Sequence, residues 1–206
     1  MENEEVLWNS YIEPGTKDVL VNLLGIKNDD MLREVEATYS SKRLLELEKD
    51  FPNMGFGKEH LNYLHNYIFQ DIYPFAGKYR KVNMQKLQGF FVRCDKIDET
   101  LDIIFKEVYE RLGKCTSKID FCQTLAYLYT MLIHCHPYRE GNGRVTREFL
   151  REFSIVKSKE IGLSEMELDW RLIDRKELNK YLEVDYMISG NIAMLFYSAL
   201  VERRIK

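Results

Sequence analysis

Cysteine and proline are scarce in this chain, which has four of each among 206 residues. No two cysteines have the Cys-x-x-Cys spacing of redox or metal motifs, so we expect reduced, buried thiols. No apolar run approaches the roughly 20 residues that a membrane-spanning helix needs. The net charge is −3, without the basic excess that binding to a nucleic-acid backbone usually leaves. We therefore expect a cytoplasmic protein without nucleic-acid or membrane partners.

The common nucleotide-binding motifs are also missing. No Gly-x-x-x-x-Gly-Lys-(Ser/Thr) occurs, and no Gly-x-Gly-x-x-Gly follows a strand pattern, so neither a P-loop NTPase nor a Rossmann enzyme is supported. The His-Cys-His triplet at 134–136 holds potential metal ligands. Residues two apart do not share a helix face, however, and no second ligand cluster accompanies them, which disfavours zinc. The nearest basic patch, 78–81, is predicted to be a solvated turn.

Helical periodicity dominates the rest of the chain. Apolar residues make up 45% of it and charged residues 31%, enough for one substantial core, so we predict a single domain over 1–206. Prolines and glycines lie mostly between the periodic segments, and the fold class is predicted to be all-α, a helical bundle. The expected helices are 17–24 (ended by Gly25), 31–48, 58–73, 98–112, 121–135, the segment after Gly143, 174–183 and 186–204.

One segment, 80–95, departs from this pattern. Val82, Met84 and the apolar run 90–92 flank a turn around Gln88-Gly89, which favours a short β-hairpin over a helix. The alternative is an ordinary connecting loop with buried aromatics.

The two expected helices at 121–135 and after Gly143 differ in how much of their surface is apolar. Segment 121–135 is apolar nearly all round, as expected of a fully packed helix, and ends directly before His136. The segment after Gly143 is predicted to bury one stripe and to expose polar residues such as Arg151 and Glu152 on the other side. The stripe comprises Val145, Phe149, Phe153 and Val156.

Between these two helices the chain runs His-Pro-Tyr-Arg-Glu-Gly-Asn-Gly-Arg-Val-Thr-Arg, residues 136–147. A histidine can accept a proton near neutral pH, and two glycines around an asparagine let backbone N–H groups approach phosphate oxygens. The following helix would present its first-turn N–H groups to the same phosphates.

Each part alone has an ordinary structural explanation. A lone Gly-Asn-Gly is most often a turn, a single histidine is more often packed or exposed, and two arginines usually form a solvated helix face. No single structural role requires the histidine, the Gly-Asn-Gly turn and both arginines in this order, with the second arginine on the same helix face as the first. We therefore interpret 136–147 as a phosphate-handling loop.

The loop resembles the signature of the Fic family, His-Pro-Phe-x-(Asp/Glu)-Gly-Asn-Gly-Arg-x-x-Arg, at every position but one. Tyr138 replaces the phenylalanine and keeps an aromatic anchor, so we expect packing to survive and chemistry to be unaffected. A second segment, 65–80, is similar to the family's recurrent segment upstream of its active-site flap. Together the two segments extend the resemblance over most of the chain.

The resemblance implies transfer of AMP from ATP to a hydroxyl side chain (Tyr, Thr or Ser) of a target protein, with release of pyrophosphate. His136 is then the general base and Glu140 the ligand of Mg²⁺. Gly143 favours AMP transfer, because a phosphate-transferring branch has lysine there.

The remaining loop residues would bind the nucleotide. Gly141, Asn142 and Gly143 are expected to hold the α- and β-phosphates. Arg144 is expected near the β-phosphate and Arg147 near the γ-phosphate.

The resemblance also makes the hairpin at 80–95 a flap that pins the target by strand addition. The flap residues expected to dock the target are Val82, Asn83, Met84, Phe90 and Phe91.

Many family members are inhibited by a helix bearing (Ser/Thr)-x-x-x-Glu-(Gly/Asn), whose glutamate pairs with the second signature arginine. Only Ser198 and Glu202 have this spacing, and Arg203 follows instead of Gly or Asn. We therefore expect Glu202 to be a surface residue and the chain to resemble the toxin-like branch, inhibited in trans by a small antitoxin. Two alternatives remain: a catalytically silent adaptor that binds a nucleotide or partner, and a de-AMPylating hydrolase.

Overall fold

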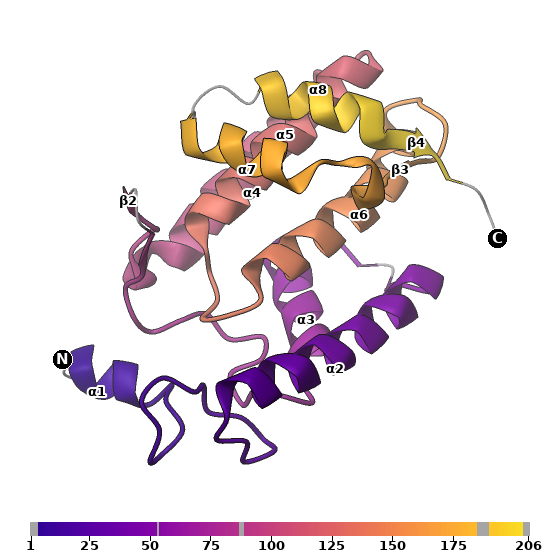
Figure 1. Cartoon of the computed structure of the whole chain (residues 1–206). Coiled ribbons are helices and arrows are strands. Elements are labelled where there is room, and N and C mark those ends of the chain that lie inside the picture. The colour runs from indigo at the N-terminus through magenta and orange to yellow at the C-terminus, as the bar shows by residue number, and fades with distance from the viewer. Residues whose placement is uncertain (1–3, 53, 87–88, 185–189, 204–206) are drawn as a thin grey trace.

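The computed structural model describes residues 4–52, 54–86, 89–184 and 190–203 of the chain. Within them the fold is a helical bundle with two small antiparallel sheets (Figure 1), so the all-α prediction is confirmed. The helices are α1 (Glu4–Asn9), α2 (Asp29–Lys49), α3 (Lys58–Phe69), α4 (Ile97–Leu112), α5 (Lys118–Cys135), α6 (Asn142–Glu160), α7 (Arg175–Val184) and α8 (Gly190–Ala199), with 3-10 turns at Cys94–Lys96 and Trp170–Leu172. The strands are β1 (Gln85–Lys86), β2 (Gly89–Phe90), β3 (Met166–Leu168) and β4 (Leu200–Glu202).

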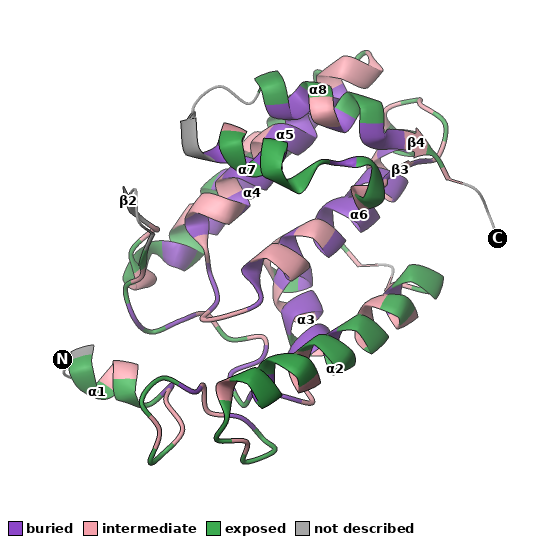
Figure 2. Cartoon of the chain, viewed as in Figure 1, coloured by how far each residue is buried: buried purple, intermediate pink, exposed green. Residues whose placement is uncertain are grey.

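Helix α5 lies at the centre of the bundle, as its apolar sequence predicts. Its N-cap Ser117 accepts a hydrogen bond from the Asp120 N–H, which satisfies one free donor of the first turn. It packs against α4, α6 and α8, and Figure 2 shows the buried residues concentrated on α5 and α6. Cys122 and Cys135 are buried as predicted, whereas Cys94 and Cys115 are only half-buried. The loop at 136–141 therefore joins two rigidly packed helices.

The prediction of a helix at 17–24 is wrong. This segment is a series of turns with an isolated bridge between Ile12 and Leu20. The Asn22 side chain accepts hydrogen bonds from the Leu24 and Ile26 N–H groups and donates to the carbonyls of Leu20 and Ile26. Such local side-chain bonds compete directly with helical hydrogen bonds, and they stabilise a turn here instead.

The C-terminal segment also differs from the single helix predicted over 186–204. Residues 185–189 and 204 lie outside the described residues, α8 ends at Ala199, and β4 then pairs antiparallel with β3. Buried serines of α6 hold the other edge of β3: the Met166 N–H donates to Ser158 Oγ and the Leu168 N–H to Ser154 Oγ. Glu202 therefore lies on a strand, and does not share a helix with Ser198.

The predicted hairpin is present. Strands β1 and β2 pair in the register Gln85 with Phe90 and Lys86 with Gly89, and Gln88 of the expected turn lies outside the described residues. Helix α3 is shorter than predicted and ends at Phe69.

Both faces of α6 are covered, so the prediction that Arg151 and Glu152 are exposed is wrong. Helix α3 packs on one side and β3 on another. Glu152 is fully buried and its Oε2 lies 2.6 Å from Nε2 of the equally buried His60. Burial lowers the pKa of His60 to about 4 and raises the pKa of Glu152 to about 7. We infer a neutral imidazole that accepts a hydrogen bond from a protonated carboxyl.

This pair predicts how Glu152→Gln responds to pH. Below pH 6.5 His60 is protonated in the unfolded chain but stays neutral in the folded chain, because its folded pKa is about 4. His60 therefore lowers the free energy of unfolding increasingly as the pH drops below 6.5. In the natural chain Glu152 offsets this loss, because its raised pKa stabilises the fold increasingly as the pH falls from about 7 towards 4.5. Gln resembles the protonated carboxyl but does not titrate, so the variant's free energy of unfolding relative to the natural chain should fall by about 2 kcal/mol between pH 7 and pH 5.

Urea unfolding at the two pH values measures this difference. The exposed Glu160→Gln, on the same helix, is the control. An equal stability difference at pH 5 and pH 7 would show that the pair does not share a proton in this way.

Candidate active site

His136 occupies a strained position at the end of α5. Its backbone is left-handed, with φ 49° and ψ 60°, and it has the only positive φ among the described non-glycine residues. Such strain persists only where surrounding contacts enforce it. The His136 N–H donates to the Leu132 carbonyl at 3.0 Å, and the imidazole stacks on Phe91 with ring centroids 3.9 Å apart and an interplanar angle of 11°. The predicted base is therefore oriented by both the helix end and the flap.

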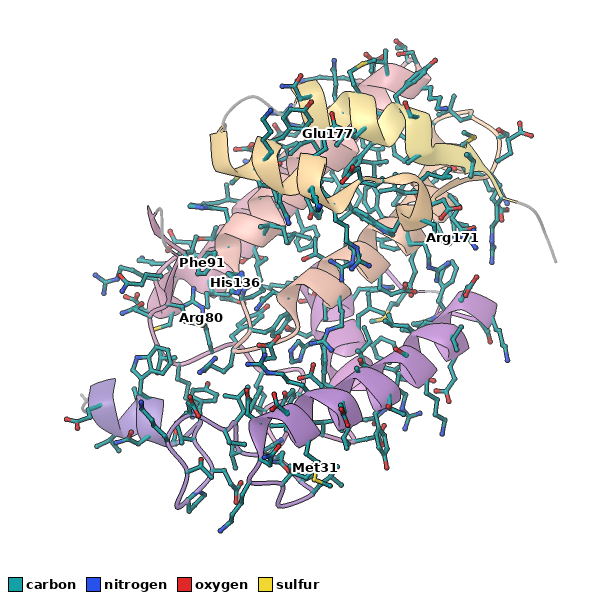
Figure 3. All side chains as sticks on the ribbon, viewed as in Figure 1. Met31, Arg80, Phe91, His136, Arg171 and Glu177 are labelled. Carbon is teal, nitrogen blue, oxygen red and sulfur yellow. The ribbon has the colours of Figure 1, made fainter. Side chains whose placement is uncertain are left out.

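Arg80 connects the flap to this loop, and sequence analysis missed it. It is 2% exposed, so the prediction of a solvated turn at 78–81 is wrong for this residue. Its guanidinium donates from Nε to the His136 carbonyl at 2.8 Å and from Nη1 to the Val82 carbonyl at 2.7 Å, and Nη2 donates to the Val92 carbonyl. Figure 3 shows Arg80, Phe91 and His136 gathered beside the flap. The buried Arg80 guanidinium thus holds Val82 and Val92, on the two sides of the hairpin, close to the backbone carbonyl of His136.

The flap residues named from the sequence differ in their placement. Val82 is buried, whereas Asn83 is exposed and accepts the Cys94 N–H on Oδ1 at 3.0 Å. The Met84 carbonyl accepts the Phe91 N–H at 3.2 Å, and both side chains are half-buried. The Phe90 side chain lies outside what the structure describes. Val82 therefore anchors the flap instead of presenting a docking surface.

Gly141 has a conformation and a position that favour glycine. Its φ is 82°, and a Cβ at this position would lie 2.3 Å from Cε2 of Phe69. Helix α6 begins at the next residue, and the N–H groups of Asn142 and Gly143 have no protein acceptor in the part of the chain that is described. These two N–H groups, called the cradle below, are therefore open to an anion at the helix N-terminus.

The Asn142 side chain is not aimed at this cradle. It is 4% exposed, its Oδ1 accepts the Tyr138 N–H at 2.9 Å and its Nδ2 donates to the Tyr138 carbonyl at 2.8 Å. Both functions of the amide are used to close the loop. In this structure the Asn142 N–H, and not the side chain, is therefore the group open to a phosphate.

Glu140 is held at its backbone and at one carboxylate oxygen. Buried His65 accepts the Gly77 N–H on Nδ1 at 2.7 Å, so its Nε2 carries the proton and donates to the Glu140 carbonyl at 3.0 Å. Burial lowers the pKa of His65 to about 4, which keeps this tautomer neutral. Glu140 Oε1 accepts the Gly141 N–H at 2.8 Å, while Oε2 has no protein hydrogen bond among the described residues. The carboxylate is ordered and still has an oxygen to offer a ligand.

The two signature arginines have different environments. Arg144 Nη1 lies 2.5 Å from Glu36 Oε1 of α2 and 3.2 Å from Ser40 Oγ, and Nη2 lies 3.5 Å from Glu140 Oε1. Arg147 has no acidic partner in the described segments, and its Nη1 lies 3.2 Å from where a Cβ on Gly143 would be. Arg144 is thus already paired, whereas Arg147 extends beside the cradle as an unneutralised cation.

Tyr138, the departure from the signature, is fully packed as predicted, at 1% exposure. Its ring stacks on His65 with centroids 3.8 Å apart. Burial raises the pKa of its hydroxyl, which donates to Asn62 Oδ1 at 2.7 Å, and Asn62 Nδ2 donates to the Tyr79 hydroxyl at 3.1 Å. The added hydroxyl therefore ties the loop to α3.

Tyr138→Phe should consequently destabilise the chain by about 1–2 kcal/mol, because Asn62 Oδ1 loses its donor. Ring stacking remains, so activity should change by less than about threefold. Urea unfolding measures the loss. Tyr63→Phe is the matched control, since Tyr63 lies on α3 beside Asn62 and its hydroxyl makes no hydrogen bond within the described residues. An equal loss in the two variants would contradict the role of the Tyr138 hydroxyl.

These features define a class of protein: a helical domain that presents a histidine, a helix N-terminus with open N–H groups and a carboxylate on one loop beside a hairpin. The Fic/DOC family profile matches residues 55–154. The chain is 31% identical, over 95% of its length, to protein adenylyltransferase VbhT of Bartonella schoenbuchensis, and it spans 38% of that protein's length. It is 30% identical, over 75% of its length, to the probable protein adenylyltransferase y4lH of Sinorhizobium fredii, of which it covers 79%.

A solved structure shows the same fold. The BepC protein of Bartonella tribocorum, with bound AMPPNP, superposes with a TM-score of 0.76 at 22% identity and covers 96% of this chain and 98% of that one. The chain belongs to the Fic/DOC family, which confirms the resemblance inferred from its loop.

Proposed function

We propose that this chain is a protein adenylyltransferase that transfers AMP from ATP to a hydroxyl side chain of a target protein and releases pyrophosphate. The observation that carries the proposal is the single loop that joins an oriented His136 to the free N–H groups at the start of α6. The names of the curated relatives and the AMPPNP bound to BepC support the same chemistry.

His136 supplies the base in this reaction. It takes the proton of the target hydroxyl as the oxygen attacks the α-phosphorus, and the bond from that phosphorus to the α,β-bridging oxygen breaks to release pyrophosphate. The N–H groups of Asn142 and Gly143 bind the phosphate oxygens, while Arg147 places positive charge where negative charge builds up on the leaving group. Arg144, paired with Glu36 and near Glu140, keeps the carboxylate ordered and adds positive charge on the β-phosphate side.

The donor set fits Mg²⁺ bound mainly through substrate. Glu140 offers one hard carboxylate oxygen beside the cradle, and the described residues hold no group of three or more His, Cys, Asp or Glu side chains that could enclose an ion. Mg²⁺ typically uses one or two carboxylates, phosphate oxygens and waters. Bound there, the ion would neutralise charge on the phosphates.

The flap presents the target. A two-stranded hairpin held by Arg80 beside the imidazole can add an extended target segment through main-chain hydrogen bonds. This mode recognises backbone more than side chains, so it leaves the target sequence open. No helix in the described ranges is long and apolar enough to cross a membrane.

Inhibition is proposed to come from a separate small antitoxin that carries an inhibitory glutamate helix. Glu202 is exposed on β4 and accepts the Ser164 hydroxyl at 3.0 Å, which favours the expected surface role over inhibition from within the chain. Activity of the isolated chain supports this proposal, whereas an inactive chain released by Glu202→Gly would overturn it.

Intact-mass spectrometry tests the proposed reaction. The purified chain and lysate proteins are incubated with ATP and Mg²⁺, with and without EDTA. A gain of one AMP on a protein is expected, sensitive to EDTA. Loss of AMP from a modified protein would instead favour the hydrolase, and nucleotide binding without any transfer would favour the silent adaptor.

A further inference from the structure

A small cavity of about 110 Å³ opens beside Arg147. Polar and aromatic residues of four elements line it, and those used below are Arg147, Arg175, Tyr129 and Asn179. The volume exceeds that of a few water molecules and suits a phosphate group. Because Arg147 Nη1 lies next to Gly143, the cavity adjoins the phosphate cradle at the start of α6.

Helix α7 places a second arginine at this cavity. Arg175, Leu178 and Asn179 are spaced i, i+3, i+4 on α7 and therefore share one helix face. Leu178 is buried and fixes this face against the core, while Arg175 and Asn179 remain exposed at the cavity. The family signature includes Arg147 but does not extend to α7.

The two arginines lie together without an acidic counterpart in the segments described. Within those segments neither has an ion pair with an acidic side chain, and no acidic residue lines the cavity. Burial lowers the pKa of Arg147, and the nearby charges of Arg175 and Arg144 act in the same direction. Two like charges at a partly buried site repel each other, and a bound anion would remove this cost.

We propose that Arg175 binds the terminal phosphate of a nucleoside triphosphate together with Arg147, which makes it a specificity residue for triphosphate over diphosphate. This inference rests on the proposed function, because it takes the nucleotide to lie along the cradle with its γ-phosphate in the cavity. Asn179 and the Tyr129 hydroxyl supply neutral donors to the same group. Burial raises the pKa of Tyr129, so its hydroxyl stays protonated and can donate.

Isothermal titration calorimetry with ATP and with ADP, both with Mg²⁺, tests this role. All variants are built on His136→Ala to prevent turnover. Arg175→Gln should weaken ATP binding about 10-fold or more and change ADP binding by less than about twofold. Arg175→Lys should retain part of the preference for ATP, because it keeps the charge but loses the planar guanidinium. Lys176→Gln, the neighbouring cation outside the cavity, should change neither affinity.

Two results overturn the inference alone: ATP and ADP affinities that both stay unchanged in Arg175→Gln, or an equal loss for both nucleotides, which would indicate a structural role. If neither the natural chain nor the His136→Ala chain binds either nucleotide, the proposed function fails together with the inference. If the His136→Ala variants show the expected difference between ATP and ADP binding but the natural chain transfers no AMP, the triphosphate site is supported and the proposed reaction is contradicted.

Discussion

His136→Ala should abolish AMP transfer while leaving nucleotide binding nearly intact. Removing a positioned general base typically slows a reaction by about 10²- to 10⁴-fold, and the proposed reaction assigns no other base to the target hydroxyl. The cradle should survive, because it consists of N–H groups at the start of α6, whose packing does not depend on the imidazole. We therefore expect a loss of at least about 10³-fold in transfer rate and an ATP affinity within about threefold of the natural chain.

Transfer is measured by mass spectrometry and ATP affinity by calorimetry. His134→Ala is the matched control, since this histidine lies two residues earlier on α5 and outside the loop; it should retain transfer. A His136→Ala chain that transfers AMP at more than about a tenth of the natural rate would contradict the assignment of the base. Loss of ATP binding together with transfer would show that the imidazole also shapes the cradle.

The chemistry of this site could be predicted from the sequence because its parts are contiguous. Residues 136–147 run from the end of α5 through the first turn of α6, so their spacing already implies a base at one helix end and an anion site at the start of the next. The hairpin could be predicted because its alternation and glycine are local signals. Neither prediction required knowledge of long-range packing.

Residues that act over long sequence distances could not be predicted in this way. Arg80 was taken for a solvated residue because its neighbours are basic, yet its acceptors include a carbonyl 56 residues away. The position of Asn142 between glycines likewise does not reveal that its side-chain amide closes the loop onto Tyr138. Glu36 pairs with Arg144 from a helix more than 100 positions earlier, and no pattern in the sequence links them.

The errors in secondary structure have similar causes. The turn at 17–24 depends on where the Asn22 side chain finds its partners, which local propensity does not reveal. Strand β4 continues directly from α8 and is held by β3, a partner more than 30 residues away. Such pairing overrides the helical preference of a short segment.

Gly141→Ala should both destabilise the chain and inactivate it. A non-glycine residue at φ 82° costs about 1–2 kcal/mol, and the added methyl would also collide with the buried ring of Phe69 at 2.3 Å. We expect a total loss of about 2–4 kcal/mol in the free energy of unfolding. Because Phe69 is fixed in the core, the loop must move, and a displacement of about 1 Å at a cradle can slow a reaction about 10²-fold.

Gly162→Ala separates these two effects. Gly162 has nearly the same φ, 81°, but nothing lies within 4 Å of an added Cβ, so it should cost only the backbone strain of about 1 kcal/mol and leave AMP transfer unchanged. The difference between the two variants, measured by urea unfolding and by mass spectrometry, is the cost of the collision. Phe69→Leu combined with Gly141→Ala should recover part of both losses, because the smaller side chain makes room for the methyl group. If Gly141→Ala behaves like Gly162→Ala, the close approach of the loop to α3 does not position the cradle.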